Sequence, residues 1–279
     1  MKNTLIIGDR IDVDELKSIQ LNILMVIDEF CRNNEINYSL ACGSLLGAIR
    51  HNGFIPWDDD IDIQLLREDY NKLLVEFPQM YSHVSLISLE RDKRWNRAYA
   101  RAYDVRTIET EGVNGEIDGI GVGIDVFPID KVPNDEKQWL KYNKTRMFIQ
   151  DIYQLKLMRW SKKRSLIRNL IVILAHVALF PLSLRGISKR IDSLAQKYNP
   201  CLSDYLYETC QGIGKNRERF LLSDFSDYID ADFENNKLKI IVGYDDYLKN
   251  TYGNYMVLPP SEKRVSHHQF TAYWKEPVN

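Results

Sequence analysis

The stretch from Ala41 to Leu65, ACGSLLGAIRHNGFIPWDDDIDIQL, carries the densest set of chemically informative residues in the chain. It begins with a turn of small residues, Gly43, Ser44 and Gly47. It ends in an acidic run, DDDID, that leads into an apolar strand pattern. Alternate side chains of an extended strand share one face, so aspartates two residues apart point the same way. The sequence therefore predicts a row of carboxylates at the start of a strand.

This acidic row predicts a metal site. Asp58, Asp60 and Asp62 are expected on one face, and Asp59 on the other. Carboxylates this close repel one another unless a cation lies between them, and oxygen ligands favour Mg²⁺, Mn²⁺ or Ca²⁺ over Zn²⁺. We therefore expect a divalent cation, Mg²⁺ or Mn²⁺, at this site. The alternatives are a solvated acidic turn, which the apolar flanks disfavour, and an EF-hand loop, which needs glycine where Ile63 stands.

A further carboxylate is predicted from residues 119–130, GIGVGIDVFPID. Its Asp125 lies between Ile124 and Val126, as a lone acid inside an apolar strand. A buried carboxylate is costly unless it is paired or bound to a metal. Asp125 is therefore expected to be the third ligand beside Asp60 and Asp62. The alternative is an ion pair with one of three arginines: Arg97, Arg101 or Arg106.

The composition is that of an ordinary globular protein of 279 residues, with 44% hydrophobic and 27% charged residues. A formal net charge of −2 gives no reason to expect nucleic acid as a partner, because nucleic-acid binding usually shows as a basic excess. The four cysteines form no CxxC pair and are too sparse for a disulfide scaffold. Residues 1–17 lack the pattern of a secretory signal. We therefore expect a cytoplasmic protein.

Apolar periodicity predicts the secondary structure. Helices are expected over residues 14–34, 43–49, 68–77, 135–161, 166–198 and 245–252. Strands are expected over 38–42, 60–66, 84–89, 99–103 and 119–130, with short strands and turns over 205–214 and 228–242. Three parts follow from this order: a catalytic core over 1–133, a helical insertion over 134–200, and a C-terminal part over 201–279 that completes the active site.

Residues 166–184, LIRNLIVILAHVALFPLSL, form a strongly apolar segment that follows a basic stretch. Its apolar run is shorter than the roughly 20 residues that span a bilayer, and Pro181 interrupts it. A short apolar helix after basic residues suits an element lying on an anionic membrane surface. A buried helix explains the pattern equally well, because periodicity cannot separate the two.

Two further segments are candidates for substrate binding. Gly43 and Ser44 begin a helix directly after a strand, which presents backbone N–H groups to an anion. Residues 253–270, GNYMVLPPSEKRVSHHQF, combine a Pro-Pro turn with four hydrogen-bond donors: Lys263, Arg264, His267 and His268. Loops are where proteins often place binding residues, although solvated surface is the alternative for each of these basic side chains.

Three blocks of sequence resemble the LicD family of phosphotransferases: GSLLGAIRHNGFIPWDDDIDI, GIDVFPID and YGNYMVLPPSEKRVSHH. That family includes bacterial phosphorylcholine transferases and is similar to the catalytic domain of fukutin-related protein. The resemblance implies an α+β fold with a nucleotidyltransferase-like mixed-sheet core flanked by helices. It also implies Gly43 and Ser44 at the phosphates and four metal ligands: Asp58, Asp60, Asp62 and Asp125.

The reaction implied by this resemblance transfers a phospho-group, phosphocholine foremost, from a CDP-activated donor to a hydroxyl of a glycan or glycolipid. Arg50 and either Lys263 or Arg264 would contact the diphosphate. The base would be Asp125 or a histidine such as His268. Other substrate-binding candidates are His51, Trp57 and His267.

Choline would need aromatic faces, because a quaternary ammonium donates no N–H hydrogen bond. Four aromatic residues lie near the motif in sequence, although aromatic residues on strands usually belong to the core: Trp57, Trp95, Tyr99 and Tyr103. Other hypotheses are CDP-ribitol or CDP-glycerol as donor, a nucleotidyltransferase, or a non-catalytic, metal-stabilised binding protein at the inner membrane face.

Overall fold

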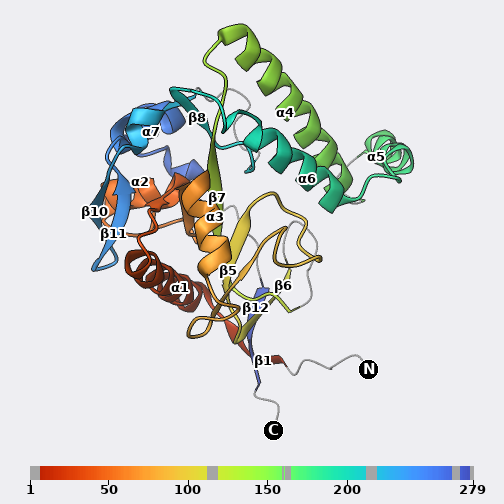
Figure 1. Cartoon of the computed structure of the whole chain (residues 1–279). Coiled ribbons are helices and arrows are strands. Elements are labelled where there is room, and N and C mark those ends of the chain that lie inside the picture. Colours follow the sequence, from red (N-terminus) through yellow and green to blue (C-terminus); the bar gives the residue numbers. More distant parts are fainter. Residues whose placement is uncertain are drawn as a thin grey trace.

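A computed structural model describes residues 7–111, 119–158, 160, 165–211, 219–265 and 271–276. A mixed sheet of seven strands lies at its centre (Figure 1). Five strands run across it in the order β2 (Ser39–Leu40), β3 (Asp62–Leu66), β7 (Gly123–Lys131), β5 (Ala100–Asp104) and β4 (Val84–Ile87). β8 (Tyr205–Tyr207) pairs with the end of β7, and β9 (Phe220–Leu221) pairs with β8. The observed architecture is therefore a mixed sheet flanked by helices, as the sequence predicts.

The centre of the sheet is the parallel pair β3 and β7, and the other pairs in this sheet are antiparallel. Ile63 and Leu65 of β3 are fully buried, as are Ile124 and Val126 of β7. Parallel strands are usually covered on both faces, which explains these apolar runs. The strand predicted over 60–66 begins only at Asp62, so Asp60 lies in the loop before the strand.

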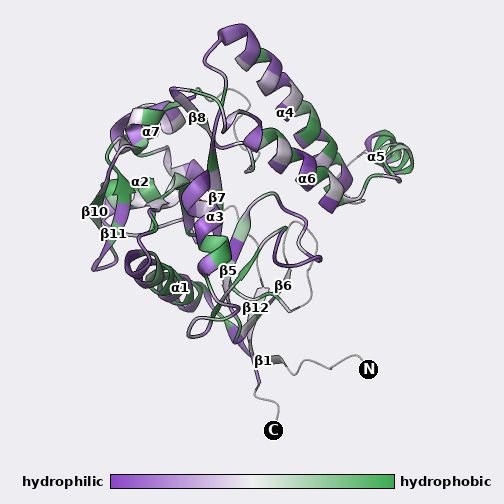
Figure 2. Cartoon of the chain, viewed as in Figure 1, coloured by the Kyte–Doolittle hydropathy of each residue, from purple (hydrophilic) through white to green (hydrophobic). Residues whose placement is uncertain are grey.

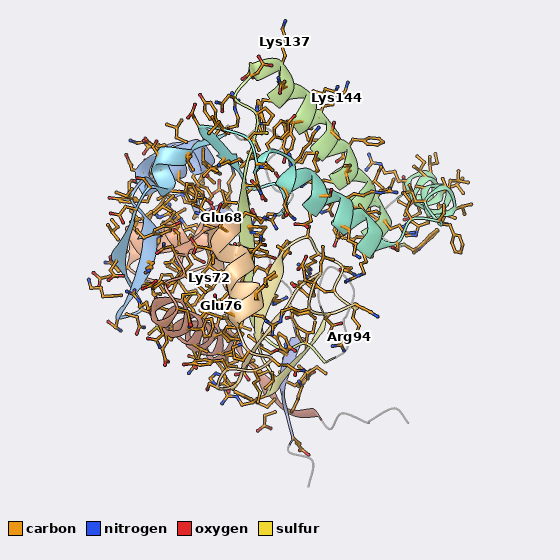
Figure 3. The ribbon with its side chains drawn as sticks, in the orientation of Figure 1. Glu68, Lys72, Glu76, Arg94, Lys137 and Lys144 are labelled. Atoms are coloured by element: carbon orange, nitrogen blue, oxygen red, sulfur yellow. The ribbon has the colours of Figure 1, made fainter. Side chains whose placement is uncertain are left out.

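Helices α1 (Val13–Asn33), α2 (Cys42–His51) and α3 (Arg67–Glu76) belong to the core. The Asp12 side chain accepts a hydrogen bond from the Glu15 backbone and thereby caps α1, which packs on β5 and β7. On α3, Glu68, Lys72 and Glu76 follow one another at helical spacing along the helix face in view (Figure 3).

Two smaller sheets complete the core. The first contains β1 (Ile7–Ile11), β12 (Thr271–Lys275) and β6 (Thr107–Glu111), and it joins the two ends of the chain. This three-stranded sheet was not predicted from the sequence. The second is the hairpin of β10 (Tyr228–Phe233) and β11 (Asn236–Ile241). It is tied to β2 by the hydrogen bond from the Ile241 backbone to Ser39 Oγ, 3.1 Å.

The remaining helices are α4 (Glu136–Leu157), α5 (Leu166–Ala178), α6 (Leu184–Ala195) and α7 (Tyr244–Tyr252), with short 3₁₀ turns η1 (Gln196–Tyr198), η2 (Leu222–Phe225) and η3 (Ser261–Lys263). α4 and α6 lie side by side, and α5 projects from their far end (Figure 1). The single helix predicted over 166–198 is wrong. The helix breaks around Pro181, which has no backbone N–H, and α6 starts anew with Ser183 as its cap.

Candidate active site

The parallel pairing of β3 and β7 brings two predicted carboxylates together. Asp62, the first residue of β3, is the register partner of Asp125 in β7. The backbone N–H of Asp125 also donates to the Ile61 carbonyl, 3.1 Å, so the two strands are joined up to this point. Asp58 and Asp60 come from the loop that leads into β3. The strand pairing therefore gathers acids that lie about sixty residues apart in the sequence.

The Gly-Ser turn of α2 lies against the same acids. The Ser44 hydroxyl, which is 5% exposed, accepts a hydrogen bond of 2.9 Å from the Asp62 backbone. A Cβ placed on Gly43 would lie 2.6 Å from Asp58 Oδ2, so a side chain here would displace that carboxylate. The predicted phosphate-binding turn and the predicted metal ligands are thus neighbours.

A close approach of two glycines makes this arrangement possible. After α2 the chain turns back along the helix, and a Cβ on Gly47 would lie 2.4 Å from the Gly53 carbonyl oxygen. Any larger residue at Gly47 would push the two segments apart. The returning segment places Trp57 directly before Asp58. The sequence from the helix to the acidic row therefore folds as one compact unit.

The acids repel one another strongly. Burial is the main reason that the pKa of Asp62 is well above its usual range, and the negative charges of Asp60, Asp125, Glu208 and Asp58 raise it further. Glu208 was not predicted from the sequence. It follows β8 and is only 4% exposed. The sequence does not single it out, because Asp204 directly precedes YLY and Thr209 follows Glu208, so it lacks the apolar neighbours on both sides that identified Asp125.

Asp59 is separated from the other aspartates of the row. It is buried, whereas Asp58, Asp60 and Asp62 are partly exposed.

Asp125 also lies near an arginine, as the alternative interpretation predicted. Arg101 Nε is 3.8 Å from Asp125 Oδ1, while the same guanidinium is bound to Glu109 at 3.1 Å. Arg106 is bound to Asp104 instead. Asp125 Oδ1 is buried and accepts no hydrogen bond from any residue that the structure describes. Arg101 therefore does not satisfy this oxygen.

The donor set fits a divalent cation in its chemistry. Carboxylate oxygens are the ligands that Mg²⁺ and Mn²⁺ prefer, and the unsatisfied Asp125 Oδ1 is an oxygen that a cation could use. Within the described ranges, no three Asp, Glu, His or Cys side chains are grouped closely enough to hold a metal ion. The acids are gathered at one place, and their side chains are not arranged around one point.

A cationic group lies at the other end of α2. We use this term for Arg50, His51, Trp57 and Arg264. Arg50 Nε donates to His51 Nε2 at 2.9 Å, and Arg50 Nη1 donates to the Tyr255 carbonyl at 2.7 Å. The Arg264 guanidinium lies over the Trp57 ring, 5.7 Å from its centroid, and the His51 ring meets Trp57 edge-on. The predicted basic loop, through Arg264, therefore contacts Trp57 of the predicted motif.

Positive charges in this group face one another. Burial lowers the pKa of Arg50, Tyr252 acts in the opposite direction, and the neighbouring Arg264 lowers it by a smaller amount. Burial and the charge of Arg50 both lower the pKa of His51. Lys263 is exposed next to Arg264, and His267 and His268 lie outside the described residues. Such a group is suited to an anionic ligand.

Of the four aromatic candidates, Trp57 alone belongs to the cationic group. Trp95 is buried and donates from its indole N–H to the Tyr99 carbonyl, 2.6 Å. Tyr99 packs edge-on against Phe127, and Tyr103 packs against the cluster around Trp95. These three residues are part of the core, as is usual for aromatic side chains on strands.

Comparison with known proteins places the chain in a family. The family model described as "LicD/FKTN/FKRP, nucleotidyltransferase domain" matches residues 35–164. The lipopolysaccharide cholinephosphotransferase LicD of Haemophilus influenzae is 30% identical over 272 residues, which are 95% of this chain and 98% of that protein. An uncharacterized protein of Rickettsia typhi is 40% identical over 75 residues, 25% of this chain and 24% of its own length. The chain belongs to the LicD family of phosphotransferases.

Proposed function

We propose that this chain transfers phosphocholine from CDP-choline to a hydroxyl of a cell-surface glycan, lipopolysaccharide foremost, and releases CMP. The observation that carries this proposal is the pairing of Asp62 with Asp125 beside the Gly43–Ser44 turn. It occurs in a chain that is similar over nearly its whole length to a lipopolysaccharide cholinephosphotransferase.

The acids would hold the cation that such a reaction needs. Asp58, Asp60, Asp62 and Asp125 are the proposed ligands, and their mutual repulsion is what a bound cation would relieve. Bound there, Mg²⁺ or Mn²⁺ would neutralise the negative charge that grows on the phosphoryl and leaving oxygens. Glu208 is close enough to raise the pKa of Asp62 and would add to the negative charge around the cation.

The cationic group would hold the diphosphate of the donor. Arg50 and Arg264 carry charges that oppose each other in the absence of an anion. A diphosphate between them would replace this repulsion with charge-assisted hydrogen bonds. Gly43 and Ser44, in the first turn of α2 at the opposite end from Arg50, would present backbone N–H groups to a phosphate beside the acids.

Trp57 would recognise the choline group. A quaternary ammonium is bound through aromatic faces. The guanidinium of Arg264 lies over the Trp57 ring, so this ring is open to a cation, and choline would take its place there. Asp58 follows directly in the sequence and would add a negative charge near the same ligand. CDP-ribitol and CDP-glycerol lack the cationic head group, so Trp57 favours choline over them.

The transfer itself needs a base for the acceptor hydroxyl. The hydroxyl oxygen forms the new bond to phosphorus, the bond to the oxygen of CMP breaks, and the hydroxyl proton goes to the base. Asp125 is a candidate because its Oδ1 accepts no hydrogen bond from the described residues. His268 is the other candidate.

Release of CMP by the purified full chain tests the proposal. CDP-choline, CDP-ribitol and CDP-glycerol are supplied in turn, with lipopolysaccharide as acceptor and with Mg²⁺ or EDTA. We expect CMP release only from CDP-choline, and only when Mg²⁺ is present. The Asp60→Ala variant should lose this activity, and the Glu76→Gln variant should keep all of it. Glu76 is the matched control, because it is an exposed carboxylate on α3.

Two outcomes would replace the proposal. Pyrophosphate released from a nucleoside triphosphate would identify a nucleotidyltransferase. No turnover with any donor, together with unchanged behaviour of Asp60→Ala, would identify a binding protein.

A further inference from the structure

Helix α5 exposes a broad apolar face. Seven large apolar side chains of this helix are between 46% and 76% exposed: Leu166, Ile167, Leu170, Ile171, Ile173, Leu174 and Val177. At about 100° per residue, these positions fall within an arc of roughly 160° around the helix axis. Figure 2 shows α5 as a largely hydrophobic helix at the edge of the molecule. The buried-helix interpretation of this segment is therefore wrong.

The opposite face of α5 is fixed to the rest of the protein. Asn169 and Val172 are buried there. The His176 Nε2 atom lies 3.1 Å from the Leu155 carbonyl oxygen of α4, and Lys156 Nζ donates to the Leu179 carbonyl at 2.9 Å. These contacts hold the helix in one orientation, so its apolar face is presented outward.

Apolar side chains next to α5 in the sequence extend this character. Met158 and Trp160 precede the helix and are 42% and 57% exposed, and Phe180 follows it at 84%. Trp residues favour the boundary between water and lipid headgroups. So many large apolar side chains in one exposed segment mark an interaction surface.

The sequence that contains α5 is strongly basic between Asp151 and Asp192. Residues 152–191 contain nine Lys or Arg and no Asp or Glu, which leaves 28 basic and 39 acidic residues in the rest of the chain. A second copy of the chain seated on α5 would bring two such basic segments together. An anionic surface would instead be attracted.

We propose that α5 docks the protein on the surface of an anionic lipid bilayer. The helix lies in the headgroup region with its apolar face toward the acyl chains, and the basic sequence around it supplies the attraction to the lipid phosphates. Its 13 residues measure about 20 Å, which is less than the ~30 Å of a hydrocarbon core. None of the helices within the described ranges is long and apolar enough to cross a membrane.

Cosedimentation of the full chain with lipid vesicles tests this proposal. Vesicles of phosphatidylethanolamine with phosphatidylglycerol are compared with vesicles of phosphatidylcholine alone. We expect binding to the anionic vesicles that is at least about tenfold tighter and that weakens as salt is added. This measurement needs no turnover, so it is independent of the proposed reaction.

Matched pairs of substitutions locate the contact. Leu170→Asp with Leu174→Asp should weaken binding to the anionic vesicles at least about tenfold, because two apolar side chains leave the lipid. Val75→Asp with Met80→Asp is the control, since these side chains are 84% and 56% exposed outside the basic segment. Equal thermal unfolding of the two variants shows that both are folded.

Three results would overturn the proposal. They are no binding to anionic vesicles, equal binding by the two double variants, or a dimer in solution that is lost in Leu170→Asp with Leu174→Asp while no vesicles are bound. The last result would assign α5 to contact between copies of the chain.

Discussion

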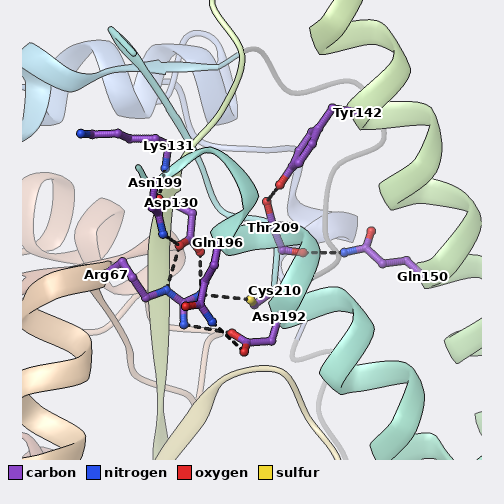
Figure 4. A network of polar contacts seen from close by, with 10 residues as sticks. All are labelled: Arg67, Asp130, Lys131, Tyr142, Gln150, Asp192, Gln196, Asn199, Thr209 and Cys210. Carbon is purple, nitrogen blue, oxygen red and sulfur yellow. Dashed lines mark hydrogen bonds and ion pairs between the residues drawn. The ribbon is translucent and has the colours of Figure 1, made fainter. Parts of the chain in front are cut away.

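Two groups of charged residues rest on the same pair of strands and differ in how their charge is balanced. At the start of β3 and β7, Asp62 is paired with Asp125. Five residues further along each segment stand Arg67 and Asp130. Arg67 donates from Nε to Asp130 Oδ1 at 2.8 Å and from Nη2 to Oδ2 at 2.6 Å, a bidentate ion pair (Figure 4).

The Arg67 end is a complete structural network. Asp130, 1% exposed, also accepts from Asn199, and Arg67 donates to Asp192 of α6 at 2.9 Å. Burial opposes the charge of Arg67, but the hydrogen bond and charge of Asp130 raise its pKa above the usual value. The network therefore joins the central sheet to the helices, with each buried charge matched by a partner.

At the Asp62 end the acids outnumber the basic side chains, because Arg101, 3.8 Å from Asp125 Oδ1, is also bound to Glu109. No ion pair of Asp62 is found among the residues that the structure describes; burial raises its pKa most, and the surrounding carboxylates raise it further. A protein rarely keeps such repulsion unless a ligand relieves it. The Arg67–Asp130 pair, the matched end, joins elements of the fold, and the contrast supports our proposal that Asp62, at the unmatched end, belongs to a cation site.

Replacing Asp62 should produce the largest change in activity. It should also distinguish the Asp62 end from the Arg67 end, because only activity should be lost. Asp62→Asn is expected to lower CMP release about 10³-fold, because cation binding stabilises the developing charge by several kcal/mol. The free energy of unfolding should stay the same or rise, because one repelling charge is removed. Turnover and urea unfolding measured on the same sample check both statements. A variant that is both active and less stable would show that Asp62 serves the fold.

Removing the Arg67–Asp130 ion pair should have the opposite result, a loss of stability. Arg67→Ala is expected to lower the free energy of unfolding by about 3–5 kcal/mol, because Asp130 is left as an unpaired buried charge. Urea unfolding measures this loss. Arg67→Met combined with Asp130→Leu should recover part of it, since the buried Asp130 charge is removed too and only Asp192 loses its ion pair. A loss below about 1 kcal/mol in Arg67→Ala would show that the ion pair does not stabilise the fold.

A smaller change tests the contact between the Gly-Ser turn and the acids. In Gly43→Ala the new methyl group meets Asp58 Oδ2, the end of a side chain that can turn away. We expect CMP release to fall about 10- to 100-fold through misplacement of Asp58, while thermal unfolding changes little. Wild-type activity in Gly43→Ala would mean that the position of Asp58 is unimportant.

The smallest expected effect concerns the cationic group, which lies apart from both ends. Burial and Arg50 lower the pKa of His51 below 6.5. The unfolded chain therefore binds this proton more readily, and the contribution of His51 to stability falls as the pH drops below about 6.5. A titration of the His51 ring protons by NMR should give this low pKa, and Arg50→Gln should move it back toward 6.5. A pKa above 6.5 in the wild type would contradict the arrangement.

The sequence could predict both strands of the site because their signals are local. Asp62 and Asp125 each lie in an apolar pattern that predicts a buried strand. The lone acid in an apolar strand was enough to place Asp125 beside Asp62, but the parallel register that pairs them was not predicted, because it depends on residues far apart in the chain. For the same reason, the sheet that joins β1 to β12 was missed, because its strands come from opposite ends of the chain.

Other features needed the folded chain. Nothing local distinguishes Arg67 and Asp130 from solvated surface charges, because their balance arises only when β3, β7 and α6 meet. Glu208 reaches the acids through the pairing of β8 with the end of β7. A buried helix and an exposed surface helix would show the same apolar pattern in residues 166–184. Only the packing of α5 in the folded chain distinguishes them.

The affinity of the chain for Mn²⁺, measured by calorimetry, tests the central claim most directly. We compare the wild type with Asp62→Asn and with Glu76→Gln, the exposed carboxylate control. The unmatched acids should bind Mn²⁺ in the wild type and in Glu76→Gln, and at least about tenfold more weakly in Asp62→Asn. Equal affinity in all three proteins, or no binding by the wild type, would contradict the claim that the unmatched end of β3 and β7 is a cation site.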